Sequence, residues 1–188
     1  GVSYQFVTIT DVTKQNTGNA IPFDSTEVYE GTYATTKYLV DSNNVDQRFV
    51  LTDIRADTST LTVRVQNSIT DTTTTTYTKA TDITQLSSSS TVYYLQETES
   101  GKFEVYFGDG ATSVALSDGN IVQLNYVVTN KTVANGASSF TSPGAIDGIT
   151  GVTVTTVANA IGGSEPETIS SIKLNAPLDY ASQGRAVT

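Results

Sequence analysis

Short runs in which apolar and polar residues alternate constrain the fold of this chain more than any other feature. The clearest run is Thr60–Asn67, in which Leu61, Val63 and Val65 are separated by polar residues. Successive side chains of a β-strand point to opposite faces of the sheet, so this spacing predicts a strand with one face against a core. A chain built from such runs is expected to fold as packed sheets, because each run has an apolar face to bury.

Similar runs recur along the chain and are separated by turn residues such as Gly, Asn and Asp. We expect strands over 4–9, 26–40 (one long strand or two short ones), 47–54, 60–67, 91–97, 102–107 and 120–128, and a further strand over 151–157. Strands at this short and regular spacing are typical of a sandwich or a barrel. The predicted fold class is therefore mainly β: an antiparallel β-sandwich or barrel-like module with a short helical C-terminal segment.

The stretch 70–84 is of low complexity and rich in threonine. Threonine is β-branched and favours an extended backbone, so we expect an exposed edge strand here, with disorder as the alternative. An exposed edge that carries little charge can pair with a strand of a neighbouring subunit. We therefore assign Thr72, Thr74 and Thr76 to an edge-strand interface.

The composition changes near Pro143 and suggests a division of the chain. We interpret residues 1–142 as an all-β module. Residues 143–188 are interpreted as a strand plus a helical segment. The chain ends without a helix cap or a closing strand, so we expect this second part to be the start of a further domain that is truncated in this fragment.

The helical segment is expected to begin near Ser164. Serine caps helices, Pro166 suits the first turn, and the acidic Glu165 and Glu167 are favourable near the positive end of the helix dipole. We expect Pro177 to end the helix, because proline lacks the backbone N–H that a helix interior needs.

The residue types that are missing exclude several kinds of chemistry. The chain has no Cys, His, Met or Trp. Without Cys there are no disulfides and no thiolate chemistry, and without His there is no Ser-His-Asp triad and there are few zinc sites. We predict no catalytic residues, no cofactor and no metal ion. The net charge of −9 also makes nucleic acid and anionic membranes poor partners.

Two glycine-containing turns between 104 and 128 could be ligand sites or corners. Their residues are Phe107, Gly108, Asp109 and Gly110 in the first turn, and Gly119 and Asn120 in the second. Phosphate-binding loops place a helix after the glycines, whereas a strand follows here, and an EF-hand loop needs a closing Glu that is absent. We interpret both as structural turns, because Gly tolerates positive φ and Asp accepts hydrogen bonds from its own turn.

Two further functions stay open on the residues alone. Ten Tyr and six Phe at strand spacing favour core packing, but aromatic residues among Thr and Ser can also bind sugars. Any two of the 19 acidic residues could form a glycosidase pair, but the sequence gives no way to select one. By themselves the residues support a rigid module that is either a structural assembly protein or a glycan-binding adhesin.

A series of motifs along the chain resembles one family. The motifs are Tyr106–Gly110 with Gly119-Asn120-Ile121, then Ala134-Asn135-Gly136, then Gly162-Gly163 with Glu165 and Glu167, and finally Arg185-Ala186-Val187-Thr188. This series, in order and across nearly the whole chain, resembles the baseplate wedge proteins of contractile-tailed (myovirus) phages, a group related to the baseplate J-like family. The family often has Gly soon after the Gly-Asp-Gly turn, where this chain has Thr112 and Ser113.

The resemblance implies a structural subunit of the phage tail baseplate in the virion, assembled in the host cytoplasm, and not an enzyme. It implies a contribution to baseplate ring assembly and to the control of sheath contraction. The implied partners are other baseplate wedge subunits and copies of the full-length protein itself, while the fragment alone is expected to be a monomer or a weak oligomer. The alternative function is a receptor- or glycan-binding β-module of a tail fibre or surface layer.

Overall fold

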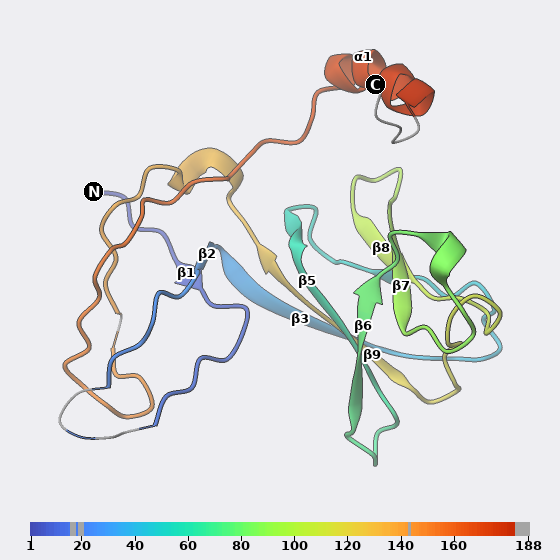
Figure 1. The fold of residues 1–188 in the computed structure, drawn as a ribbon, viewed down its shortest axis with the longest axis horizontal. Helices are drawn as coiled ribbons and strands as arrows, with labels where there is room; N and C mark the ends of the chain where they lie inside the picture. The colour runs from blue at the N-terminus through green and yellow to red at the C-terminus, as the bar shows by residue number, and fades with distance from the viewer. Residues whose placement is uncertain (16–17, 19–20, 143, 183–188) are drawn as a thin grey trace. The chain divides into compact units, whose positions relative to one another are not determined.

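The computed structural model describes residues 1–15, 18, 21–142 and 144–182. The chain divides into two compact units, residues 1–130 and residues 131–188. All strands of the described residues belong to the first unit (Figure 1). The assignment of 143–188 to a further domain remains a prediction.

Among the described residues, the first unit contains nine strands and one short 3₁₀ helix. The strands are β1 (Phe6–Val7), β2 (Tyr29–Glu30), β3 (Thr32–Leu39), β4 (Phe49–Val50), β5 (Ala56–Gln66), β6 (Thr74–Lys79), β7 (Val92–Glu97), β8 (Phe103–Tyr106) and β9 (Ile121–Val128), and the 3₁₀ helix is Ile83–Gln85. The second unit contains a 3₁₀ helix, Lys131–Ala134, and the helix α1, Ile169–Ser182.

Seven strands form one sheet in the order β3-β9-β5-β6-β7-β8-β4. Every neighbouring pair is antiparallel except β6 and β7, which run parallel. The two outer strands approach each other: the Tyr38 hydroxyl of β3 donates a hydrogen bond of 2.5 Å to the Val50 carbonyl of β4. The Tyr38 ring also meets Phe49 edge-on, with 5.7 Å between ring centres. The sheet is therefore nearly closed, which confirms the predicted mainly β, barrel-like fold.

The strand β9 lies between β3 and β5, and its second half is buried from Leu124 to Val127. The ladder between β5 and β9 has a bulge between Asp57 and Thr62. In the bulge, the buried Thr60 hydroxyl accepts a hydrogen bond of 2.9 Å from the backbone N–H of Val127. This side chain replaces a lost ladder partner, because a buried backbone N–H without a partner would be costly.

Aromatic rings fill one end of the core. Phe107 meets Phe49 at 5.6 Å and Tyr77 at 5.2 Å between ring centres, both edge-on, which is a favourable geometry for aromatic pairs. Tyr126 is fully buried, and its hydroxyl accepts a hydrogen bond of 3.1 Å from the backbone N–H of Thr52. The aliphatic residues with no exposed surface are Leu51, Val63, Val105, Val122, Leu124 and Val127.

The predicted stretch 26–40 forms two strands, β2 and β3, which are divided at Gly31. Gly31 has φ of +129°, and a Cβ there would collide with the Val128 carbonyl of the neighbouring β9. Only glycine allows this close approach of two backbones. The strands expected over 4–9 and 47–54 are shorter than predicted, because only two residues of each pair with a neighbour.

Two expectations for the second part of the chain were wrong. Residues 151–157 are not a strand, because the described residues offer them no ladder partner and strands form only in pairs. The helix begins at Ile169 and continues through Pro177 to Ser182. A proline removes one backbone hydrogen bond and crowds the preceding turn, but the residues that follow can still form their own bonds. Among the described residues, no helix is both long and apolar enough to cross a membrane.

The core position of Leu124 can be tested against an exposed leucine in the neighbouring strand. We expect Leu124→Ala to lower the free energy of unfolding by about 2–5 kcal/mol, because it leaves a cavity beside fully buried neighbours. Leu39→Ala is the matched control, because Leu39 is 65% exposed, and its effect should stay within about 0.5 kcal/mol. Urea unfolding followed by tyrosine fluorescence measures both. Equal effects of the two substitutions would contradict the assigned core.

Candidate functional site

The first predicted turn follows β8 and turns the chain with Phe107 anchored in the core. Gly110 has φ of +94°, which favours glycine. The Asp109 carboxylate accepts a hydrogen bond of 3.0 Å from the backbone N–H of Ala111, so it stabilises its own turn. This geometry is that of a corner.

Glycine is needed at position 108 for a different reason: there is no room for a side chain. A Cβ at this position would collide with the hydroxyl oxygen of Ser113. Ser113 is fully buried, and its hydroxyl has no hydrogen-bond partner among the described residues. The Ser113 side chain therefore packs against the backbone of Gly108, and this contact brings the two sides of the turn together.

The second predicted turn joins the ends of three strands. Gly119 has φ of +78°. The Asn120 side chain accepts a hydrogen bond of 2.8 Å from Ser117 N–H and donates one of 2.8 Å to the Asn67 carbonyl, just beyond β5. The Asn120 carbonyl accepts a bond of 2.9 Å from Val40 N–H, just beyond β3. Asn120 thus ties β9 to both of its neighbours at one end.

Within the described ranges there is no group of three or more acidic side chains that could hold a metal ion. The side chains of Asp109 and Asn120 are hydrogen-bonded to backbone groups. That these turns bind no ligand remains a prediction.

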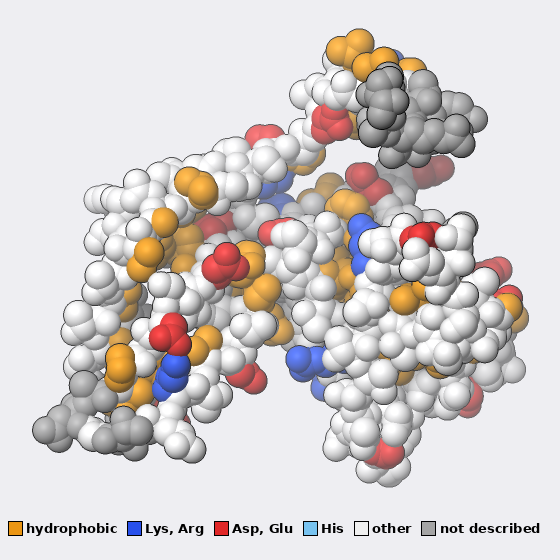
Figure 2. Space-filling view, viewed as in Figure 1, with side chains coloured by type: hydrophobic (Ala, Val, Ile, Leu, Met, Phe, Trp, Pro, Cys, Tyr) orange, Lys and Arg blue, Asp and Glu red, His pale blue; other side chains and the backbone are white. Residues whose placement is uncertain are grey.

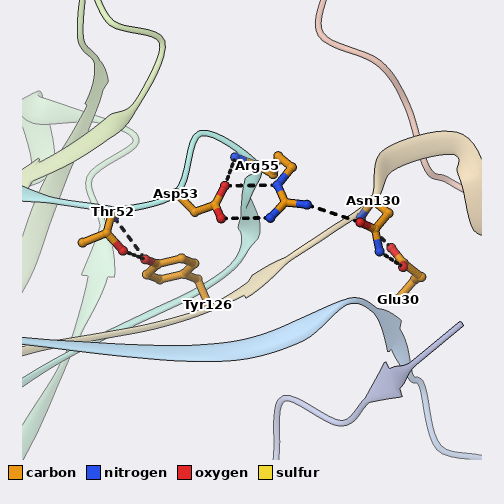
Figure 3. Close-up of polar contacts among 6 residues, drawn as sticks. All are labelled: Glu30, Thr52, Asp53, Arg55, Tyr126 and Asn130. Carbon is orange, nitrogen blue, oxygen red and sulfur yellow. Dashed lines mark hydrogen bonds and ion pairs between the residues drawn. The ribbon is translucent and has the colours of Figure 1, made fainter.

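A polar network, which the sequence did not reveal, lies at the opposite end of β9 (Figure 3). The Glu30 carboxylate accepts hydrogen bonds from the backbone N–H of Asn130 (2.8 Å) and from its side-chain amide (2.7 Å). The Asn130 side-chain oxygen accepts a bond of 3.4 Å from Arg55, which also forms an ion pair of 3.1 Å with Asp53. The network joins β2, the end of β9 and the loop before β5.

In this network, Asp53 and Arg55 stabilise each other's charged form. Hydrogen bonds from the Arg55 side chain and backbone keep the pKa of the Asp53 carboxyl below its ordinary value. The pKa of Arg55 is raised in turn by its bond to Asp53. No spacing in the sequence could have shown the network, because Glu30 and Asn130 are 100 residues apart.

The threonine-rich segment occupies a different place from the one expected. β6 lies between β5 and β7 and is not an outer strand of the sheet. However, it pairs with β7 only at Thr78 and Lys79, so the half that contains Thr74 and Thr76 pairs with β5 alone. Thr72 precedes the strand, and all three predicted threonines are exposed. Their role as an interface remains a proposal.

In the second unit, four residues form what we call the clasp: Lys131, Asn135, Gly163 and Glu165. The Asn135 side chain donates a hydrogen bond of 2.8 Å to the Gly163 carbonyl and accepts one of 3.0 Å from the Gly163 N–H. Lys131 forms an ion pair of 3.3 Å with Glu165. A Cβ on Gly163 would collide with the Lys131 carbonyl, so this close approach requires glycine.

The clasp closes a long segment, residues 137–160, which we call the arm. Backbone bonds of 2.8 Å join Gly136 N–H to the Ala160 carbonyl and Ala160 N–H to the Ala137 carbonyl at its base. Ile146 and Ile149 form an isolated bridge within it. The arm exposes apolar side chains, with Val154 43% and Val157 78% exposed.

The structure brings together motifs that are far apart in the sequence. Ala134-Asn135-Gly136 and Gly162-Gly163 with Glu165 meet in and beside the clasp. Glu167 lies just before α1 and accepts hydrogen bonds from Ser171 (2.5 Å) and Asn175 (3.0 Å). The motif at 185–188 lies outside the described residues.

Comparison with known proteins agrees with this reading of the motifs. Residues 26–140 match the family described as bacteriophage baseplate wedge protein gp6, third domain. The chain belongs to this family. The match includes the whole seven-stranded sheet, both corner turns and the first half of the clasp. The predicted resemblance to baseplate wedge proteins is thereby confirmed.

A relative from the same group is the baseplate wedge protein gp6 of Enterobacteria phage T4. It is 32% identical over 123 residues, and the match covers 54% of this chain. The chain spans 19% of the length of that relative.

The first corner can be tested with a pair of substitutions. We expect Gly108→Ala to destabilise the first unit by about 1–3 kcal/mol, because the added methyl group collides with Ser113. Ser113→Ala removes an unpartnered hydroxyl and should cost little. The double substitution Gly108→Ala with Ser113→Ala should recover part of the loss. Thermal and urea unfolding measure the series, and simple additivity of the two changes would refute the proposed collision.

The clasp can be tested through the protection of the arm. We expect Gly163→Ala to break the bonds with Asn135 and to increase amide hydrogen exchange at Gly136 and Ala160 at the base of the arm. Gly144→Ala is the control, because nothing lies near its added methyl group. Limited proteolysis should cut the Gly163→Ala arm faster than that of the control. Equal rates for both variants would show that the clasp does not hold the arm.

Proposed function

We propose that this chain is a structural part of a baseplate wedge subunit in the tail of a phage with a contractile tail. The observation that carries the proposal is the family match over residues 26–140, which covers the complete sheet. The relative in phage T4 bears the name of a baseplate wedge protein, and the proposal extends that role to this chain. Its place would accordingly be the tail baseplate of the virion.

The fold suits a part that keeps its shape under load. A nearly closed sheet has fewer free backbone edges than an open one, and its strands are tied at both ends of β9 by Asn120 and Asn130. Such a module can transmit force between neighbours without deforming, because close-packed interiors are stiff. We propose that this mechanical role, and no catalysis, is the contribution of the chain to ring assembly and to the control of sheath contraction.

The surface also fits assembly with other proteins. Charged residues make up only 15% of the chain, and Figure 2 shows large areas of uncharged side chains and backbone. Interfaces between protein subunits are depleted in charged residues at their centres. We propose that the partners are other baseplate subunits and copies of the full-length protein, and that the isolated chain associates weakly.

Immunogold electron microscopy of intact phage particles tests the proposal. An antibody raised against the 188-residue chain should place gold at the baseplate, where tail and fibres join. Antibody adsorbed beforehand with the purified chain is the control and should leave particles unlabelled. Gold at the fibre tips, or no gold on particles with an accessible baseplate, would overturn the baseplate assignment and favour a receptor-binding module.

A further inference from the structure

One half of β6 has a free hydrogen-bonding edge. The backbone N–H of Asn67 donates to the Thr73 carbonyl at 3.0 Å, so the odd-numbered residues of this strand face β5. The N–H of Thr78 donates to the Thr91 carbonyl at 3.0 Å, on the β7 side. Backbone groups alternate in direction along a strand, so those of Thr74 and Thr76 also point away from β5.

Nothing in the described chain pairs with this edge beside Thr74 and Thr76. The segment that leads into β7 turns aside at Ser87–Ser90, where Ser90 N–H bonds to the Ser87 carbonyl at 2.9 Å. β7 therefore begins beside Thr78, and no described segment pairs with this edge of β6 before that point. An added strand would lie in line with β7.

The edge is uncharged and exposed. Residues 72–78 carry no charge, and the side chains of Thr74 and Thr76 are exposed. The whole chain has a net charge of −9, so most contacts between two copies would bring acidic surfaces together. An uncharged strand at an uncharged edge avoids this repulsion.

The arm contains a segment of matching chemistry. Residues 151–157 alternate valine and threonine over most of their length, which favours an extended strand, yet they have no ladder partner in the described chain. The sequence from 148 to 164 carries no charge. Val154 and Val157 are left exposed to solvent. One copy of the chain thus holds an unpaired strand edge and an unpaired strand-forming segment, both neutral.

We propose that the free edge of β6 at Thr74–Thr76 binds segment 151–157 of a second copy of this chain as an added β-strand. The backbone groups of Thr74 and Thr76 supply two donors and two acceptors, and β7 blocks the edge from Thr78 onward. The contact is therefore short. It links isolated chains only weakly, with dissociation constants on the order of a millimolar, and it becomes significant where a larger assembly holds the copies together.

Amide hydrogen exchange of the ¹⁵N-labelled 188-residue chain tests the contact. The probe is a synthetic peptide with the sequence of residues 150–158. With millimolar peptide, exchange at Thr74 and Thr76 should slow severalfold. Exchange at Thr75 should not change, because its N–H already faces β5 and so serves as an internal control. Unchanged exchange at all three threonines, or equal slowing at all three, would overturn the proposal.

Two variants distinguish a specific backbone contact from non-specific binding. Thr76→Pro removes one outward N–H that β5 does not use, so the fold should tolerate it and peptide binding should be lost. Thr76→Val keeps the backbone and should bind as well as the original chain. A peptide with proline in place of Val154 should not bind, and this measurement needs no altered protein. Equal binding by the proline variant or the proline peptide would refute strand addition.

The full chain provides the test for a second copy as the partner. Raising the concentration of the chain without peptide should slow exchange at Thr74 and Thr76 in the same alternating pattern. The Val154→Pro chain should lose this concentration dependence. Protection by the peptide but not by the chain itself would exclude a second copy as the partner. Because these readouts concern the chain alone, they are independent of where the protein lies in the virion.

Discussion

The central position of β9 is the constraint on which the rest of the first unit depends. β9 pairs with β3 along its whole length and with β5 on its other side. A strand with neighbours on both edges and buried residues on both faces cannot shift its register without exposing part of the core. Asn120 fixes its beginning to the ends of both neighbours. Asn130, beyond its end, is fixed to Glu30. The second corner and the network therefore both hold this strand in place.

The sequence was sufficient for the class of fold because alternation is a local property. The run at 60–67 lies in β5 except for its last residue, Asn67, and 120–128 contains β9 almost residue for residue. The residues that define the corners could also be named, since the need for positive φ at Gly110 and Gly119 is a property of the turn itself. The role of Gly108 could not, because it depends on Ser113 lying against its backbone across the turn.

What the sequence could not supply were the partners of each strand. The Thr-rich segment has the composition of an edge strand. It lies between β5 and β7 because β7 pairs with it in the parallel direction, and no local sequence pattern encodes that pairing. Conversely, residues 151–157 have the composition of a strand but do not form one, because they lack a partner among the described residues. Strand propensity describes how well side chains fit a half-buried pleated surface, and that surface must be provided by another strand.

The clasp shows how motifs that are far apart in the sequence can form one structural feature. Closing a loop costs conformational entropy that grows only slowly with its length, so a few bonds at the base can hold an arm as long as 137–160. Those bonds need an amide that both donates and accepts, as Asn135 does, and a partner without a side chain, as Gly163 is. The arm itself therefore needs no internal contacts to keep its two ends together. Its exposed valines and the absence of charge from 148 to 160 are unexplained by packing in the described chain, and they are properties expected of a surface that another protein chain covers.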